Sequence, residues 1–496
     1  MSVDPQSPGT RPAVSPSGAP DPAPGGAAAP GASDAASTRS LARFSVLWLG
    51  QFVSNVGSGL TAFGLAAYLF ERTGAATSVT LVTLCAFLPP ALLAPLAGVL
   101  ADRFDRRLIM IAGDGLSMLG LAYILGVALA GDVAPWQIYL GVLCSSLFGS
   151  LLDPAYRATV TDLVPAEHYD RASGMVQLAA SSKYLISPVL AGFLYPLLGI
   201  AGILVLDIAT FAVTVATTLA VRRHLRRSSA AARQAPQPER AGRRRAERRG
   251  RELLRGWREL TAHPGVLTVV GIMALATFCV GFLETLFPPM MLSFSTPQTL
   301  GVVQTVAATG MIAGSLVLST VTVTTRYVQE LLIGLGIAGV CIAGIGITAN
   351  PVVIAVAGFC FFASLPFVNT PAEVLIRSAI PNAAQGRAWG LISLLSNIGF
   401  VAAFASAGPL ADRVFGPLLL PEGALAGSLG SILGTGPGRG IGLMIVLVGA
   451  LLAVAALCLG GSRRLAAFTS ADPGSRSRDG SGEDLADPAV DQRRLR

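Results

Sequence analysis

Between residues 43 and 460, long apolar stretches alternate with short polar segments. Each apolar stretch has roughly the 20 residues that an α-helix needs to cross the hydrocarbon core of a bilayer. Strands of a membrane barrel would alternate over about 10 residues, and the sequence shows no such segments. The pattern therefore predicts an all-α integral membrane protein with twelve helices, over residues 43–70, 77–101, 108–130, 134–158, 172–196, 201–221, 265–291, 298–322, 328–348, 351–376, 387–411 and 438–460.

These helices group into two sets of six, which predicts one six-helix bundle over residues 41–221 and a second over residues 265–460. The N-terminal residues 1–40 consist mainly of Pro, Ala, Gly and Ser, and residues 461–496 are polar and charged. Segments with so few large apolar side chains cannot build a packed core, so we expect two disordered tails.

The two sets resemble each other in sequence. Residues 165–192 align without a gap on residues 381–408, so that Gly192 falls on Gly408. Six-helix halves related by an axis along the membrane normal are typical of transporters. We therefore expect two similar bundles around a central cavity.

Charge makes up only 13% of the chain, against roughly a quarter in a soluble domain. Arginines concentrate in residues 222–264, between the two sets of helices. Because cytoplasmic loops carry an excess of basic residues, this segment is predicted to be a cytoplasmic loop rather than a nucleic-acid site, with anionic lipid as a secondary contact. An even number of helices then places both termini in the cytoplasm.

The six cysteines lie in apolar stretches and the three histidines in polar loops. Neither type shows the spacing of metal ligands or of a disulfide framework. No grouping of nucleophile and base stands out either. We therefore expect no enzymatic activity, no cofactor and no metal.

The segment GVLADRFDRR, residues 98–107, joins the second and third predicted helices. Its glycine permits close approach of a neighbouring helix, and its first aspartate suits the positive N-terminus of another helix. Its arginines could pair with Asp153 or Asp162. We expect a latch that holds the cytoplasmic side shut, formed by Gly98, Asp102, Arg103, Arg106, Arg107, Asp153 and Arg157. The alternative is that the arginines only orient the chain.

With this loop and two sets of six helices, the chain resembles the major facilitator superfamily, whose hallmark there is G-x-L-A-D-R-x-G-R-R. Asp105 replaces the hallmark glycine, which looks like the branch of bacterial macrolide and siderophore exporters. The resemblance implies a fold of two six-helix bundles and export across the cytoplasmic membrane. It also implies that Asp102 faces the start of the eleventh helix, near Arg387.

Lys183, the single lysine of the chain, lies near mid-depth of the fifth predicted helix. A lysine at the centre of a membrane helix costs about 3 kcal/mol on insertion scales, so a carboxylate should balance it. The segment also resembles the antiporter motif G-x-x-x-G-P-x-x-G-G of the family. Pro188 and Gly192 match this motif, whereas Lys183 and Ser187 replace its leading glycines. A structural ion pair and a functional site both remain open.

Four acids within predicted helices are candidates to balance the charge of this lysine: Asp114, Asp207, Glu284 and Asp153, of which Asp153 is assigned rather to the latch. The resemblance places Glu284 on a helix that lines the central cavity, where it would bind a proton or a cation. Asp207 is expected to be a structural partner of Lys183. The sequence leaves the pairing open.

Uncharged polar residues in the predicted cavity helices could bind a substrate or neighbouring helices: Asn55, Gln177, Asn369 and Asn397. The leading hypothesis is proton-coupled export, by alternating access, of an amphipathic small molecule such as an antibiotic, secondary metabolite or siderophore. Its partners would be this substrate, protons and membrane lipids, without nucleic acid. The alternatives are a scaffold or sensor that transports nothing, and a lysolipid flippase.

Overall fold

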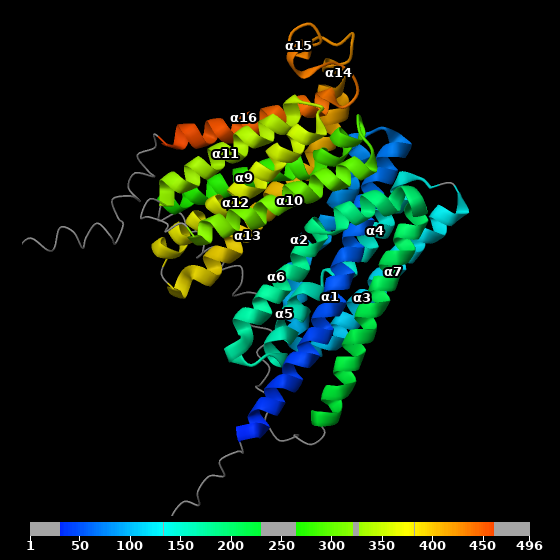
Figure 1. Ribbon diagram of the computed structural model, residues 1–496, viewed down its shortest axis with the longest axis vertical. Coiled ribbons are helices and arrows are strands. Elements are labelled where there is room, and N and C mark those ends of the chain that lie inside the picture. Colours follow the sequence, from blue (N-terminus) through cyan, green and yellow to red (C-terminus); the bar gives the residue numbers. More distant parts are fainter. Residues whose placement is uncertain (1–29, 132, 230–263, 321–326, 381, 461–496) are drawn as a thin grey trace, which may run out of the picture.

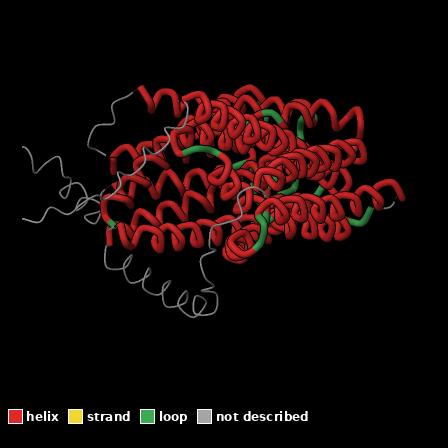
Figure 2. The backbone as a smooth tube through the Cα atoms, turned by 90° about the horizontal axis from the view of Figure 1, so that it is seen from below, coloured by secondary structure: helices red, strands yellow, loops and turns green. Residues whose placement is uncertain are grey.

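The computed structural model describes residues 30–131, 133–229, 264–320, 327–380 and 382–460. These residues form helices joined by short loops, with no strand among them (Figure 2). The predicted C-terminal tail and most of the predicted N-terminal tail and basic loop fall outside them. Helix α1 begins within the segment predicted as tail, and α7 continues past the predicted start of the basic loop.

The N-terminal half follows the predicted order of helices. Asp105 starts α3, because its Oδ1 accepts a hydrogen bond from the Arg107 backbone N–H at 3.1 Å, as a helix N-cap does. Pro135 opens α4 at a position where a missing N–H is tolerated. The helices are α1 (Pro30–Thr73), α2 (Ala76–Arg103), α3 (Arg106–Ala130), α4 (Pro135–Gly149), α5 (Leu152–Leu163), α6 (Tyr169–Leu185) and α7 (Ser187–Ser229).

The C-terminal half repeats this order and adds a folded segment before its last helix. Its long helices are α9 (Pro264–Leu292), α10 (Pro297–Thr320), α11 (Tyr327–Ile347), α12 (Pro351–Ala379), α13 (Asn382–Leu410) and α16 (Arg439–Gly460). Between α13 and α16 lie a π-helix (Ala411–Phe415) and the short helices α14 (Gly416–Leu418) and α15 (Gly430–Leu433). Figure 1 shows α14 and α15 projecting beyond the bundle.

Eleven described helices are long and apolar enough to cross a membrane, against twelve predicted. The difference lies in the fifth crossing. Helix α6, which carries Lys183, has 17 residues, and the chain bends at Ile186 before α7. The first part of α7 completes the crossing up to Gly199, whose φ of 63° separates it from the sixth; this region of φ favours glycine. The two six-helix bundles are confirmed, and the fifth crossing consists of two segments.

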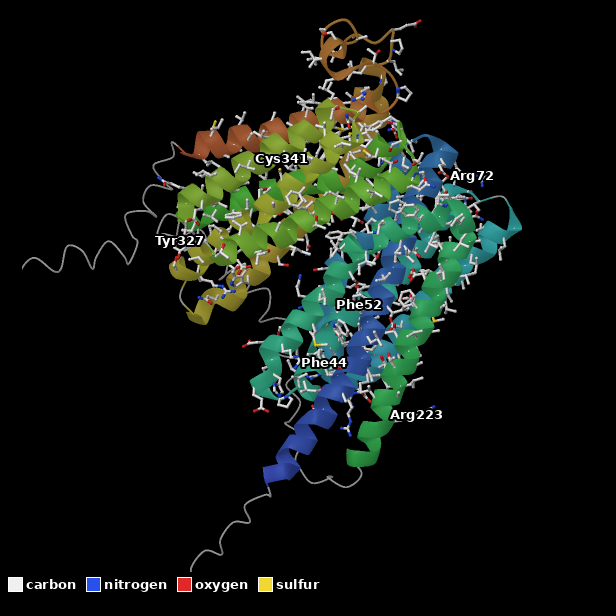
Figure 3. The ribbon with its side chains drawn as sticks, viewed as in Figure 1. Phe44, Phe52, Arg72, Arg223, Tyr327 and Cys341 are labelled. Carbon is white, nitrogen blue, oxygen red and sulfur yellow. The ribbon has the colours of Figure 1, made fainter. Side chains whose placement is uncertain are left out.

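The two halves meet at one end and separate toward the other (Figure 1). In Figure 3, Arg72 marks the end where they meet, whereas Arg223 and Tyr327 mark the separated ends of the two halves. We call the separated end, which holds Arg106 and Arg223, the basic end. The opposite end, which holds Arg72 and Asp412, is called the far end.

Two close contacts join the halves toward the far end. At Gly408 of α13, a built Cβ would lie 2.5 Å from the Thr77 Cα of α2. At Gly192 of α7, a built Cβ would lie 3.3 Å from the Gly301 Cα of α10. Small residues let membrane helices approach in this way. Both contacts require glycine, because any side chain would collide with the opposite backbone.

Candidate functional site

Lys183 lies where the fifth crossing is broken. Pro188 lacks the N–H that would continue the helical ladder, and the neighbouring Ser187 donates a hydrogen bond from Oγ to the Val56 carbonyl of α1 at 3.0 Å. Helix α1 comes close because residue 59 is glycine, where a Cβ would lie 2.9 Å from the Lys183 carbonyl oxygen. Transporters place substrate and ion sites at such discontinuous helices near mid-depth.

Asp207, in the second part of α7, is buried with 1% exposure. The Thr210 hydroxyl donates to its Oδ1 at 3.2 Å. Gly57 of α1 leaves room for this carboxylate, since a Cβ there would lie 2.6 Å from Oδ1. A buried carboxylate needs a counter-charge, and the Lys183 ammonium interacts with it electrostatically.

Glu284 belongs to α9 in the other half. Its side chain is solvent-accessible, although Leu283, Thr285 and Leu286 beside it are buried. Helix α9 packs against α1 and α2 as well as α13 and α16, and the Lys183 charge acts on Glu284 too. The accessible carboxylate therefore lies at the boundary between the two halves.

Lys183 thus interacts with one carboxylate from each half. Among the described residues it forms no ion pair at contact distance with either. Its Nζ lies 5.8 Å from the ring centre of Tyr184, which gives a weak cation–π contact. Because the Lys183 ammonium interacts with Asp207 and Glu284 but forms a contact ion pair with neither, it can shift from one acid toward the other when the charge of one of them changes.

Asp114 of α3 lies apart from this group. The side chain is fully buried, and neither carboxylate oxygen has a hydrogen-bond partner among the described residues. No interaction with Lys183 is found for it in the part of the chain that the structure describes. The structure therefore separates Asp114 from the other three predicted intramembrane charges.

The predicted polar residues have different surroundings. Gln177 and Asn369 are exposed, and Asn397 is half-buried. The half-buried Asn55 donates from Nδ2 to the Gln51 carbonyl of its own helix at 2.9 Å. An intrahelical bond of this kind satisfies the amide locally, so Asn55 is held by its own helix in this conformation.

An aromatic cluster that the sequence did not suggest joins the halves. The ring of Phe87 on α2 lies 5.4 Å from that of Phe400 and 5.3 Å from that of Phe404, both on α13. Offset and edge-on rings at these separations attract each other. The spacing of Phe400 and Phe404 marks one helix face, but the match with Phe87 depends on tertiary structure.

The predicted latch residues at the basic end pair within the N-terminal half. Arg106 Nη1 lies 2.8 Å from Asp162 Oδ1, as one of the predicted pairings required, and donates to the Ala158 carbonyl at 3.0 Å. Asp153 instead pairs with Arg157 of its own helix at 2.9 Å. Ion pairs among the described residues all stay within one half.

For Gly98, Arg103 and Arg107, no hydrogen bond or ion pair with the other half is found in the part of the chain that the structure describes. A Cβ at Gly98 would meet no atom within 4 Å, and Arg103 is exposed. Asp105, next to them, pairs with Arg222 of α7 at 3.2 Å. The Arg107 Nε is buried without a partner among the described residues. The side chains of Asp102 and Arg387 are not among those that the structure describes.

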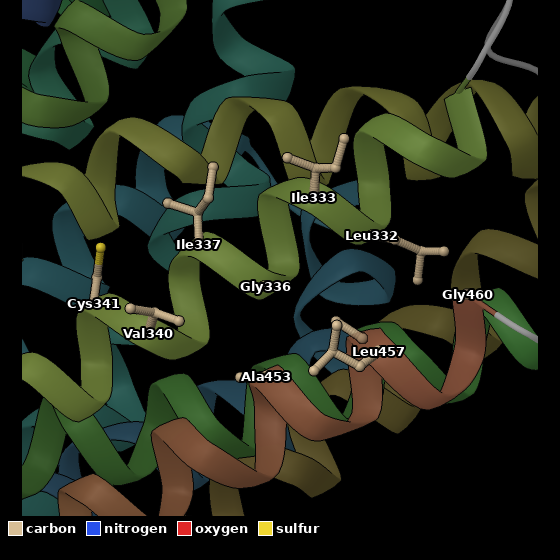
Figure 4. A pocket seen from close by; sticks show the side chains of 10 residues that line it. Leu332, Ile333, Gly336, Ile337, Val340, Cys341, Ala453, Leu457 and Gly460 are labelled. Atoms are coloured by element: carbon tan, nitrogen blue, oxygen red, sulfur yellow. The ribbon is translucent and has the colours of Figure 1, made fainter.

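A groove lies between α11 and α16 (Figure 4). It has a volume of about 560 Å³ and is lined by apolar residues such as Ile337, Val340 and Leu457. These residues lie on two apolar membrane-length helices. The thiol of Cys341 is the one polar side-chain group among its lining residues, so the groove has little means of orienting a charged or polar solute.

Comparison with known proteins agrees with this geometry. The sequence profile of the Major Facilitator Superfamily matches residues 47–404. The chain is 26% identical over 382 residues to macrolide efflux protein A of Streptococcus pyogenes, which covers 75% of this chain and 90% of that protein. It is 25% identical over 327 residues to the protein of the same name from Enterococcus faecalis, covering 64% and 96%.

Solved structures share the fold at low sequence identity. An inward-facing, unoccupied bacterial homolog of the human lysosomal transporter Spinster superposes with a TM-score of 0.59 at 15% identity, covering 90% of this chain and 99% of that one. An inward-facing bacterial homologue of the iron transporter ferroportin gives 0.58 at 14% identity, covering 83% and 99%.

Proposed function

Because the chain belongs to the Major Facilitator Superfamily and is a multi-pass membrane transporter, we propose that it exports an amphipathic small molecule in exchange for protons. One observation carries the proposal: the charge of Lys183 acts both on the buried Asp207 of its own half and on the accessible Glu284 of the other. Charges inside a membrane bundle are costly and mark transport pathways.

The basic end faces the cytoplasm in this proposal, together with both termini, because basic residues concentrate on the cytoplasmic side of membrane proteins. The halves touch at the far end and separate at the basic end. The described conformation is therefore the one that opens toward the cytoplasm and admits substrate from inside.

Glu284 is the coupling carboxylate in this scheme. While ionised, it attracts the Lys183 ammonium across the boundary between the halves. A proton or a cationic group of the substrate that binds to Glu284 cancels that attraction. The Lys183 ammonium then interacts with Asp207 alone. The electrostatic attraction between the halves, from Lys183 to Glu284, then weakens. Since a ligand shifts a conformational equilibrium only through unequal affinity for the two states, this change couples proton binding to the opening of the halves.

The proposed substrate class rests on the chemical groups that the two halves supply. Phe87 and Phe400 supply partly exposed aromatic surface from both halves, and Glu284 supplies a negative charge. An amphipathic molecule with a basic amine suits such a combination. Macrolide efflux proteins are among the relatives of the chain, which supports an antibiotic or another secondary metabolite of this kind over a sugar.

The test is protection of cells from a panel of toxic compounds, with cationic amphipaths and anionic siderophores in separate arms. We expect protection against cationic amphipaths, lost when a protonophore is added at constant ATP. Equal sensitivity of cells with and without the protein would reject export and favour a scaffold or sensor. Translocation of lysolipid without protection from drugs would show a flippase.

A further inference from the structure

We propose that Asp412 holds the far end shut and so sets the balance between the described conformation and one that is open at the far end. Asp412 lies on the π-helix after α13. Its Oδ1 accepts a hydrogen bond from the Ala76 backbone N–H at 2.9 Å, and its Oδ2 accepts one from the Thr77 N–H at 2.8 Å. Both donors belong to the other half of the protein.

Helix α2 lacks an N-cap of its own. Ala75 occupies the cap position and has no side-chain oxygen to accept from the first turn. The first N–H groups of a helix need a partner, and a carboxylate there also meets the positive end of the helix dipole. Asp412 therefore supplies from the other half the cap that α2 does not provide, and separation of the halves removes it.

The rest of the contact between the halves is packing of α2 against α13 and of α7 against α10. The contact of Gly192 with Gly301 brings two backbones together. Beside Asp412 lies a space of about 350 Å³, lined from one half by Phe70 and from the other by Ser293. To this packing Asp412 adds two charge-assisted hydrogen bonds that cross between the halves.

The fold also holds Asp412 in place. Gly408, one turn earlier, presses α13 against Thr77. In the segment that follows, Leu419 and Leu433 form a small core together with Leu443 of α16. A π-helix is rare and frequently marks a functional position. This geometry directs the carboxylate at the N-terminus of α2. Asp412 is therefore a positioning residue that acts on the contact between the halves at the far end rather than on a substrate.

Hydrogen–deuterium exchange of the full-length protein in lipid nanodiscs tests the proposal. For Asp412→Ala, we expect faster exchange in far-end peptides around Thr77 and Gly301, and slower exchange in basic-end peptides around Leu163. A loss of about 1.4 kcal/mol corresponds to a tenfold shift between conformations, so far-end exchange should accelerate roughly tenfold. Asp412→Asn keeps one acceptor oxygen and should give an intermediate shift.

Two further variants make the result decisive. Glu422→Gln removes an exposed acid from the same segment and should change nothing. Gly408→Val forces the seam apart while keeping the Asp412 side chain, and should give the same pattern as Asp412→Ala, with faster exchange at the far end and slower exchange at the basic end. If Gly408→Val shows that pattern but Asp412→Ala does not, the assignment to Asp412 is wrong. Faster exchange at both ends would also reject it, because that indicates loss of stability.

The inference rests on alternation between two conformations, which belongs to the proposed function, but not on export or proton coupling. The exchange experiment uses neither substrate nor a proton gradient. A protein that failed to protect cells would refute the exporter and leave the role of Asp412 to be decided by exchange alone.

Discussion

Gly192 and Gly408 occupy equivalent positions in the two halves, and each lies against the backbone of the opposite half. Gly192 contacts the start of α10, and Gly408 contacts the start of α2. The far-end seam is therefore built twice, with approximate two-fold symmetry. Asp412 breaks that symmetry, because Pro196 stands at the equivalent position of the first half and has no side-chain acceptor.

Glu284→Gln should abolish proton-driven export while the protein still folds. The amide keeps the shape of the side chain but can neither bind a proton nor attract Lys183 strongly. We expect drug efflux from preloaded vesicles to become independent of an imposed pH gradient. Glu373→Gln is the matched control, because Glu373 forms only an exposed pair with Arg377; such pairs contribute about 0–1 kcal/mol. Coupled efflux by the Glu284 variant would contradict the assignment.

Lys183→Met should lower thermal stability, because it leaves the buried Asp207 without its counter-charge. The double change with Asp207→Asn removes both charges and should recover most of the lost stability. When two interacting groups are removed singly and together, their coupling free energy is about 0.5–3 kcal/mol. The measurement is the unfolding temperature of each variant in detergent. Additive losses in the double variant would show that the two charges act independently.

Gly57→Ala should destabilise the N-terminal half. The added methyl group would lie 2.6 Å from Asp207 Oδ1 and 2.9 Å from Thr210 Cγ2, which forces α1 away from α7. Overpacking of this kind typically costs about 1–3 kcal/mol. Gly115→Ala is the control, since a Cβ there meets no atom within 4 Å. An unfolding temperature that falls equally in both variants would contradict the predicted close packing.

Asp105 should contribute to stability in two separable ways. Asp105→Asn keeps an oxygen that can cap α3 and loses the ion pair with Arg222, whereas Asp105→Ala loses both. Loss of an N-cap typically costs about 1 kcal/mol, so the alanine variant should unfold at the lower temperature. Identical unfolding temperatures for the two variants would show that the cap contributes nothing.

The boundaries of the membrane helices could be predicted well from the sequence, because apolar length is a direct consequence of bilayer thickness. Observed α2, α10 and α16 begin within one residue of their predicted starts. The bend at Ile186 was missed, since its cause combines Pro188 with the Ser187 bond to α1. A tertiary hydrogen bond leaves no periodic signal in the sequence.

The candidate site could be predicted only as separate residues. Lys183 was conspicuous as a cation in an apolar segment, and Glu284 and Asp207 as acids in two others. That Lys183 interacts with both acids depends on how α6 and α9 are arranged across two halves. Asp412 was missed altogether. It follows α13 in a Gly- and Pro-rich segment, and its hydrogen-bond partners are backbone N–H groups, which leave no mark in a sequence.

The electrostatic interaction of Lys183 with Asp207 bears on how the protein is made. The ribosome delivers Lys183 to the membrane well before Glu284, which belongs to the second half. Asp207 lies on the very next helix, and its burial against Gly57 requires only residues already synthesised. The nascent first half can therefore neutralise its own lysine, and its integration into the bilayer does not have to wait for the second.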